Sequence, residues 1–209
     1  MPTLYTSLLS ANGRKALAVA LQLRLKLCVQ EVDVYHGAGN TPEYRRINPW
    51  GKIPSLSDKG RHLWESNAII IYLAEQYSDF QLFSRHVDKR ADILRWLFWE
   101  AAHWQPTLSR IIKDRVAQVL FDGDSQVEPE CNWEDPEIVS LLNELQHQLS
   151  SRDFICGDSL TLADFSLAAM TTYFHACRFP EQTYPAIKTW LTRMNNIDAW
   201  KTTLHVKWR

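Results

Sequence analysis

The spacing of apolar residues divides the first 77 residues into short elements of alternating type. Residues 3–7 form a short, β-prone run, 16–25 place leucines and alanines at helical spacing, and 27–34 carry three valines in a strand-like pattern. A strand, a helix and a second strand in this order predict parallel strands joined by a right-handed crossover. Thr41-Pro42-Glu43 predicts the start of a short helix, because proline fits the first helical position.

A turn, a hairpin and a helix follow. Ile53-Pro54 cannot continue a helix, since proline lacks an N–H, and its peptide bond is a candidate for the cis form. Residues 55–64 predict two short strands around the turn Asp58-Lys59-Gly60. Ser66 is a good N-cap for the helix predicted over residues 66–77. The order β-α-β-α-β-β-α resembles a thioredoxin-like fold.

No strand pattern recurs after this point, and helical spacing dominates the rest of the chain. Residues 90–119 predict a long helix that Pro106 should bend. We therefore expect an α/β thioredoxin-like N-terminal domain over residues 1–78, a linker at 79–88 and an all-α C-terminal domain over 89–209.

The second half of that helical domain has one distinctive loop and one distinctive helix start. Residues 121–136 form an acidic stretch with two prolines, expected to be solvated, with a lid over a groove as the alternative. Thr161 and Asp164 have the spacing of a capping box, although Asp replaces the usual Glu or Gln. Further helices are predicted over 137–149, from 162 onward, over 184–194 and over 198–205.

Composition describes an ordinary globular protein and excludes several classes of function. With 45% apolar residues and a net charge of −1, nothing favours nucleic acid or an anionic membrane as a partner. The four cysteines lie far apart without metal-binding spacing, so no metal site is expected. With no signal peptide or membrane-spanning run, we expect a cytoplasmic protein.

Two motifs point to a family. Residues 48–54 read Asn-Pro-Trp-Gly-Lys-Ile-Pro, and residues 65–69 read Glu-Ser-Asn-Ala-Ile. Together with the sulfur-site loop and the capped helix, they resemble the cytosolic glutathione S-transferase family, over nearly the whole chain. The resemblance implies that glutathione is bound as a co-substrate and that the protein is a homodimer.

The resemblance also implies a role for each matching residue. The backbone of Ile53, beside a cis Pro54, would hold the cysteinyl part of glutathione. Glu65 would take the α-amino group of its γ-glutamyl end, and Ser66 the α-carboxylate. Lys52 is the nearest cation for the glycyl carboxylate, because the loop before Thr41 lacks the His, Gln or Lys that many relatives have there.

The first helix starts without the cysteine that redox proteins of thioredoxin-like fold use, so thiol chemistry would need the sulfur of the ligand. Ser10, four residues before Arg14, resembles the serine of serine-type transferases and is the first candidate to stabilise a glutathione thiolate. Asn12 is the second, since Ser-Ala-Asn-Gly-Arg-Lys also resembles a run in nu-class bacterial members. The alternative is that both residues only cap the helix.

Three functions remain open at this point. The first is conjugation of glutathione thiolate to a small hydrophobic electrophile. The second is glutathione-dependent disulfide reduction or peroxidase activity, which the nu-like run favours. The third is a non-catalytic binding or regulatory protein of the same fold. An acceptor pocket between the domains is expected beside Trp99, His103 and Trp104, although such an aromatic stripe is more often core packing.

Overall fold

The N-terminal part of the chain is built on a mixed four-stranded sheet. The computed structural model describes residues 1–121 and 129–208, and its strands lie in the order β2-β1-β3-β4. Strand β1 pairs in parallel with β2 and antiparallel with β3, and β3 and β4 form a hairpin. The strands are β1 (Thr3–Thr6), β2 (Cys28–Glu31), β3 (Ser55–Asp58) and β4 (Arg61–Trp64).

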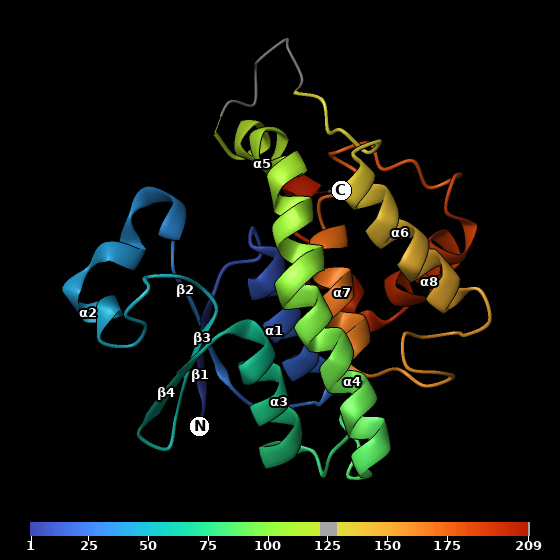
Figure 1. The fold of residues 1–209 in the computed structure, drawn as a ribbon. Coiled ribbons are helices and arrows are strands. Elements are labelled where there is room, and N and C mark those ends of the chain that lie inside the picture. The colour runs from blue at the N-terminus through green and yellow to red at the C-terminus, as the bar shows by residue number, and fades with distance from the viewer. Residues whose placement is uncertain (122–128, 209) are drawn as a thin grey trace.

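Helices surround this sheet in the order that the sequence predicts. Helices α1 and α3 lie between the sheet and the C-terminal helices, whereas α2 lies on the far side of the sheet (Figure 1). Their bounds are α1 (Ala11–Gln22), α2 (Pro42–Arg45) and α3 (Ser66–Tyr77), with 3-10 turns η1 (Val34–His36) and η2 (Ala38–Asn40) before α2. The prediction of a thioredoxin-like unit followed by a helical one is confirmed.

Helix α1 begins at Ala11, five residues before the predicted start at residue 16. The prediction treated Ser10 to Gly13 as a turn, but this run contains the N-cap and the first helical turn. Gly13 is needed there because a Cβ would lie 2.4 Å from the carbonyl oxygen of Ser7. The polar start of α1 is therefore pressed directly against the end of β1.

Strand β2 is shorter than the predicted 27–34 and is exposed along its whole length. It forms one edge of the sheet, so its valine at position 29 is 48% exposed rather than buried. The valine pattern predicted a strand correctly but could not show that it would lie at an edge.

The helical part begins after a segment without helix or strand at residues 78–86. Its first three elements run continuously, and a π-helical turn separates the two α-helices. Pro106 explains the change, because it cannot donate a hydrogen bond to residue 102 and its ring clashes with that carbonyl. The predicted interruption therefore occurs one turn before the proline. These elements are α4 (Val87–Trp99), the π-helical turn η3 (Glu100–Trp104) and α5 (Gln105–Phe121).

The remaining helices pack α7 at the centre of the domain, where nine of its ten residues are buried. The predicted helix over 198–205 is wrong in length, since α9 ends at Lys201 and a separate 3-10 turn follows. These elements are α6 (Pro136–Leu149), α7 (Leu162–Thr171), α8 (Pro185–Asn195), α9 (Asp198–Lys201) and η4 (Val206–Trp208). Residues 122–128 of the acidic stretch 121–136 lie outside the described residues, and the lid alternative falls on them. Among the helices of the described ranges, none combines the length and apolar character that crossing a membrane requires.

Asp164 organises the start of α7, and the predicted capping box is present. Its fully buried carboxylate accepts hydrogen bonds from the backbone N–H groups of Thr161 and Ile155, both at 2.8 Å, and from Trp190 Nε1 at 3.1 Å. Burial raises the pKa of Asp164 to about 6, so the group is still mostly ionised at neutral pH. One carboxylate thus joins α7, α8 and the chain before them.

We expect Asp164→Asn to destabilise the protein by about 2–3 kcal/mol, because an amide NH2 would face buried N–H donors and leave them unpaired. Urea unfolding should show the loss as a lower midpoint with an unchanged slope. As a control, Asp158→Asn changes a neighbouring acid that is exposed, and should stay within about 0.5 kcal/mol of the wild type. Equal stability of both variants would contradict the assigned role.

Candidate active site

The loop before α1 presents Ser10 at the edge of a cavity. Its Oγ accepts a hydrogen bond from the Gly13 N–H at 3.2 Å, which makes Ser10 the N-cap of α1. Accepting this bond leaves the hydroxyl hydrogen available for a second partner, and Tyr35 is in hydrogen-bond contact with Ser10. The capping role and a ligand-binding role are therefore compatible in this geometry.

Tyr173, from the chain just beyond α7, holds this loop in place. Its hydroxyl accepts from the Ala11 N–H at 2.9 Å and donates to the Leu9 carbonyl at 3.2 Å. Burial raises the pKa of Tyr173 well above its usual value, so the phenol stays neutral and can serve both bonds. The helical domain thus fixes the backbone on both sides of Ser10.

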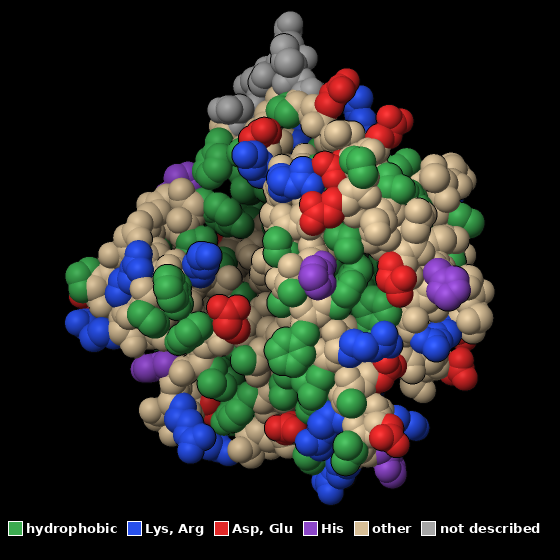
Figure 2. All heavy atoms as spheres, in the orientation of Figure 1, with side chains coloured by type: hydrophobic (Ala, Val, Ile, Leu, Met, Phe, Trp, Pro, Cys, Tyr) green, Lys and Arg blue, Asp and Glu red, His purple; other side chains and the backbone are tan. Residues whose placement is uncertain are grey.

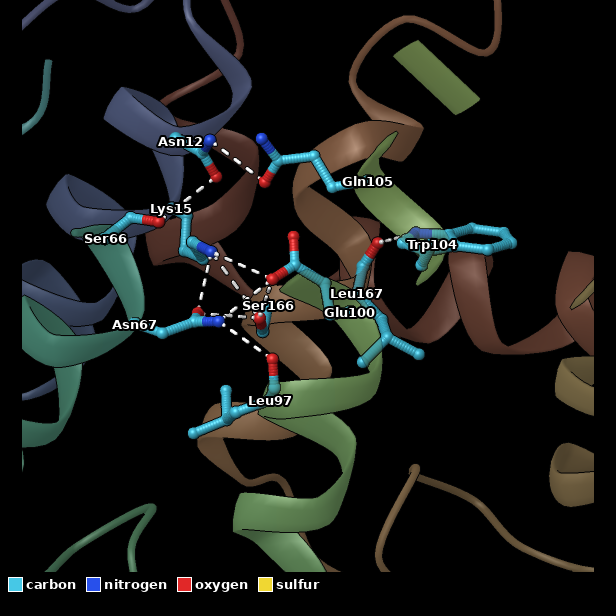
Figure 3. Close-up of polar contacts among 10 residues, drawn as sticks. All are labelled: Asn12, Lys15, Ser66, Asn67, Leu97, Glu100, Trp104, Gln105, Ser166 and Leu167. Carbon is cyan, nitrogen blue, oxygen red and sulfur yellow. Dashed lines mark hydrogen bonds and ion pairs between the residues drawn. The ribbon is translucent and has the colours of Figure 1, made fainter. Parts of the chain in front are cut away.

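Asn12 connects three elements around the same cavity (Figure 3). Its Oδ1 accepts a hydrogen bond from Ser66 Oγ at 3.2 Å, and its Nδ2 donates to Gln105 Oε1 at 3.1 Å. Both polar groups of the Asn12 side chain therefore have protein partners, and the bond to Gln105 uses one of the two hydrogens on Nδ2.

The loop before β3 is held by side chains beneath it. Tyr44 OH and Asn48 Nδ2 each donate to the Lys52 carbonyl at 2.8 Å. The Ile53-Pro54 peptide bond is cis, as the sequence predicted. Across residues 1–121 and 129–208, the backbone N–H and C=O of Ile53 have no protein partner. The side chain of Lys52 is exposed.

Helix α3 starts with a strained residue. Glu65 has φ 69° and ψ 115°, a conformation that costs a non-glycine residue about 1–3 kcal/mol and tends to occur at functional sites. The structure makes Glu65 the N-cap and Ser66 the first helical residue, which corrects the predicted N-cap Ser66. The first-turn N–H groups of α3 make this end attractive to an anion.

A buried ion pair lies directly below these residues (Figure 3). Lys15 Nζ and Glu100 Oε2 are 3.6 Å apart, with side chains 0% and 1% exposed. Lys15 also donates to Asn67 Oδ1 at 2.8 Å, and Ser166 Oγ donates to Glu100 Oε2 at 3.1 Å. Burial lowers the pKa of Lys15, and Glu100 opposes this shift. The pair therefore ties α1 and α3 to the π-helical turn and α7.

The cavity itself is a groove of about 350 Å³ between the two parts of the chain. In the space-filling view a recess opens beside the upper half of α5 (Figure 2). Its floor carries Ser10 and Asn12, and its walls are mainly apolar. The other lining residues are Ala11, Tyr35, Gln105, Ser109, Ile112, Lys113, Val116, Ala117, Leu120, Phe121, Met170 and Tyr173.

The three residues expected at this groove lie elsewhere. Trp104 is fully buried, donates from Nε1 to the Leu167 carbonyl at 3.1 Å and stacks against Trp99. His103 is exposed and, like the two tryptophans, does not line the groove. The groove begins at Gln105, because the π-helical turn rotates the preceding residues away from it.

Sequence reasoning missed Tyr35, Gln105 and Tyr173. Tyr35 stands in the groove beside Phe121, with ring centroids 6.3 Å apart. Burial raises the pKa of the Tyr35 phenol, and a hydrogen-bond contact with Ser10 partly offsets the shift. The only signal for Tyr35 in the sequence is its position directly after the strand predicted over residues 27–34.

The part of the chain that the structure describes contains no group of three or more His, Cys, Asp or Glu side chains that could hold a metal ion.

Comparison with known proteins agrees with this geometry. Residues 4–81 match the model of the glutathione S-transferase N-terminal domain, and residues 135–193 match that of the C-terminal domain. "Glutathione S-transferase D7" of Drosophila melanogaster is 30% identical over 90% of this chain and 81% of its own. "Glutathione S-transferase F10" of Arabidopsis thaliana is 27% identical over 95% of this chain and 94% of its own.

Solved structures show the same similarity in three dimensions. "Glutathione Transferase E6 from Drosophila melanogaster" superposes with a TM-score of 0.85 at 28% identity, covering 100% of this chain and 93% of its own. Matches to both domain models, together with these relatives, establish that the chain is an enzyme of the glutathione S-transferase family.

Proposed function

We propose that the protein binds glutathione across the loop before β3 and the start of α3, and uses its thiolate to attack a small hydrophobic electrophile. The unpaired backbone of Ile53 beside the cis Pro54 would hold the cysteinyl part by main-chain hydrogen bonds. Glu65 would hold the α-amino group, and Ser66 with the first-turn N–H groups of α3 would hold the α-carboxylate. Lys52 is the proposed partner of the glycyl carboxylate.

Ser10 is the proposed donor to the sulfur. A thiol with a pKa of roughly 8.5 is mostly protonated at pH 7, and lowering it by about two units requires roughly 2.7 kcal/mol of preference for the anion. One charge-assisted hydrogen bond from Ser10, at the N-terminus of α1, can supply most of this. The position of Ser10 carries the proposal: it lines the groove, and its Oγ accepts the capping bond from the Gly13 N–H, so its hydroxyl hydrogen can turn from Tyr35 to the sulfur.

The groove favours an apolar second substrate. Ile112, Val116 and Leu120 form a continuous apolar wall along α5, and Ser10 lies at its foot. Such a surface binds the apolar body of an electrophile and leaves its reactive atom close to the sulfur. Tyr35 adds a phenol that could donate to a leaving group there.

Disulfide reduction is the second candidate. Asn12 lines the groove, and the run around it resembles that of nu-class bacterial members, in which disulfide reduction is typical. Both reactions start from the same thiolate but differ in the second substrate. We therefore compare conjugation of 1-chloro-2,4-dinitrobenzene with glutathione-dependent reduction of hydroxyethyl disulfide, using one enzyme preparation. We expect the aryl halide to have the higher kcat/KM.

The comparison separates three outcomes. A higher kcat/KM for the disulfide would replace conjugation by reduction as the main activity. Turnover of neither substrate, together with no binding of glutathione, would overturn the proposal in favour of a non-catalytic binding or regulatory protein of this fold.

We further propose that the enzyme works as a homodimer in the cytoplasm. Trp50 and Phe98 are 64% and 70% exposed, which is costly for large apolar side chains on a monomer surface. Apolar side chains gather on the face over α3 and α4 (Figure 2), where a second copy would cover them. A sedimentation equilibrium mass of one chain would contradict the dimer.

A further inference from the structure

Two of the four cysteines lie beside each other in the helical part, although the sequence separates them widely. Cys131 belongs to the chain shortly before α6, and Cys177 to the turns that follow α7. Their thiols are in hydrogen-bond contact, and both are free. Neither cysteine lines the groove or is among the residues assigned to glutathione, so a reaction of this pair would be independent of the proposed one.

Trp133 holds the two chain segments together. Its Nε1 donates to the Cys177 carbonyl at 2.8 Å, and its backbone N–H donates to the Cys131 carbonyl at 2.9 Å. The indole also packs edge-on against two aromatic side chains that flank Cys177, with its centroid 5.3 Å from that of Phe174 and 5.1 Å from that of Phe179. Trp133 therefore keeps the backbones of both cysteines close together.

The two thiols differ in their access to solvent. Cys131 is half-buried, whereas Cys177 is only 3% exposed and belongs to the core of the helical part. A small oxidant can therefore reach Cys131 from solvent, while Cys177 is shielded from direct attack.

The surroundings also favour the thiolate of Cys131 over that of Cys177. Contact with the Cys177 thiol, aided by the charge of Arg115, lowers the pKa of Cys131. The same contact, together with burial, raises the pKa of Cys177. Arg115 is held beside the pair, since its Nε donates to the Ala176 carbonyl at 2.9 Å. The thiolate is the nucleophile in thiol oxidation, so Cys131 would react first and Cys177 would keep its proton until then.

We propose that Cys131 and Cys177 are an oxidation site, at which hydrogen peroxide converts the two thiols into an intramolecular disulfide. The Cys131 thiolate attacks one oxygen of the peroxide, so that an S–O bond forms, the O–O bond breaks and hydroxide leaves. The Cys177 sulfur then attacks the Cys131 sulfur; the S–S bond forms, the S–O bond breaks, and the hydroxyl group leaves as water with the Cys177 proton. The proton that Cys131 released converts the hydroxide to water. The two thiols lose two electrons, and the peroxide is reduced to water.

Peptide mapping after brief exposure to hydrogen peroxide tests the pair directly. The full-length wild-type protein is treated, alkylated under denaturing conditions and digested without reductant. We expect two peptides joined through Cys131 and Cys177, with a mass about 2 Da below the sum of the separate thiol peptides. Dithiothreitol added before alkylation should restore both thiols.

Two variants assign the roles within the pair. In Cys177→Ala the sulfenic acid on Cys131 has no thiol to condense with, so dimedone should label Cys131 at least about fivefold more than in the wild type. In Cys131→Ser the shielded Cys177 should stay reduced. Cys28→Ala removes an exposed thiol and is the matched control, which should form the same joined peptides as the wild type. Burial raises the pKa of Cys156 to about 12, so this thiol should stay reduced throughout.

Three results would overturn the proposal. They are free thiols at both Cys131 and Cys177 after treatment with millimolar peroxide, conversion of Cys131 to sulfinic or sulfonic acid without the joined peptides, and oxidation of Cys177 at an unchanged rate in Cys131→Ser. The mapping of the wild type needs no variant, so it decides the first two results even if a substitution impairs folding. A failure of the glutathione proposal would leave all of these measurements unaffected.

Discussion

Replacing Ser10 by Ala should lower kcat for conjugation at pH 7 by about 100-fold, the size of effect that follows from removing one donor to a developing or stabilised anion. The KM for glutathione should change by less than about threefold, because the peptide is held by other residues and only the thiolate loses a partner. The pH–rate profile should shift toward the pKa of a free thiol, roughly 8.5. Steady-state kinetics from roughly pH 6 to pH 9 checks both effects.

Two further variants separate the hydroxyl from the helix cap. Ser10→Gly also removes the hydroxyl, but glycine is an acceptable N-cap and costs only a few tenths of a kcal/mol, against about 0.5–2 kcal/mol for alanine. Both variants should lose activity equally while differing in stability. Ser7→Ala lies in the same loop, where its hydroxyl faces Glu31, and should keep kcat within about threefold. If the activities of the two Ser10 variants instead follow their stabilities, Ser10 acts only as the N-cap of α1.

The second large effect is on stability. Glu100→Ala should cost about 3–5 kcal/mol of unfolding free energy, because it leaves the Lys15 ammonium buried without its carboxylate. Replacing both partners together, in Lys15→Met/Glu100→Leu, should recover most of this loss, since an apolar pair of similar volume avoids the desolvation cost. Urea unfolding of the wild type, both variants and the exposed control Glu144→Ala provides the comparison.

The outcome also tests how the two parts of the chain are joined. The ion pair connects α1 to the π-helical turn, so its loss should be seen in one cooperative transition. A Glu100→Ala variant within about 1 kcal/mol of the wild type would mean that water or another acceptor replaces Glu100 as the partner of Lys15.

Local patterns predicted the features whose signals lie close together in the sequence. The cis Pro54, the hairpin after it and the capping box at Asp164 each depend on neighbouring residues. The start of α1 was placed too late since Gly13 looks like a turn residue, and its need for close contact with β1 appears only in three dimensions.

The groove could not be predicted in the same way. Tyr173 holds the Ser10 loop from more than 160 positions along the chain, and no local pattern signals such a contact. Trp99 and Trp104 looked like groove residues because regular α-helical spacing was assumed up to Trp104, and the π-helical turn breaks that spacing before the predicted bend at Pro106. Ser10 and Asn12 lie on the groove floor, where the family resemblance suggested a sulfur site.

The central claim is that this site ionises the thiol of bound glutathione. The thiolate absorbs near 240 nm, so a difference spectrum of the glutathione complex, followed as a function of pH, gives the pKa of the bound thiol directly. For the wild type we predict a pKa of the bound thiol about two units below that of the free thiol, and for Ser10→Gly a pKa of roughly 8.5. Glutathione that binds the wild type with an unshifted pKa would contradict the account.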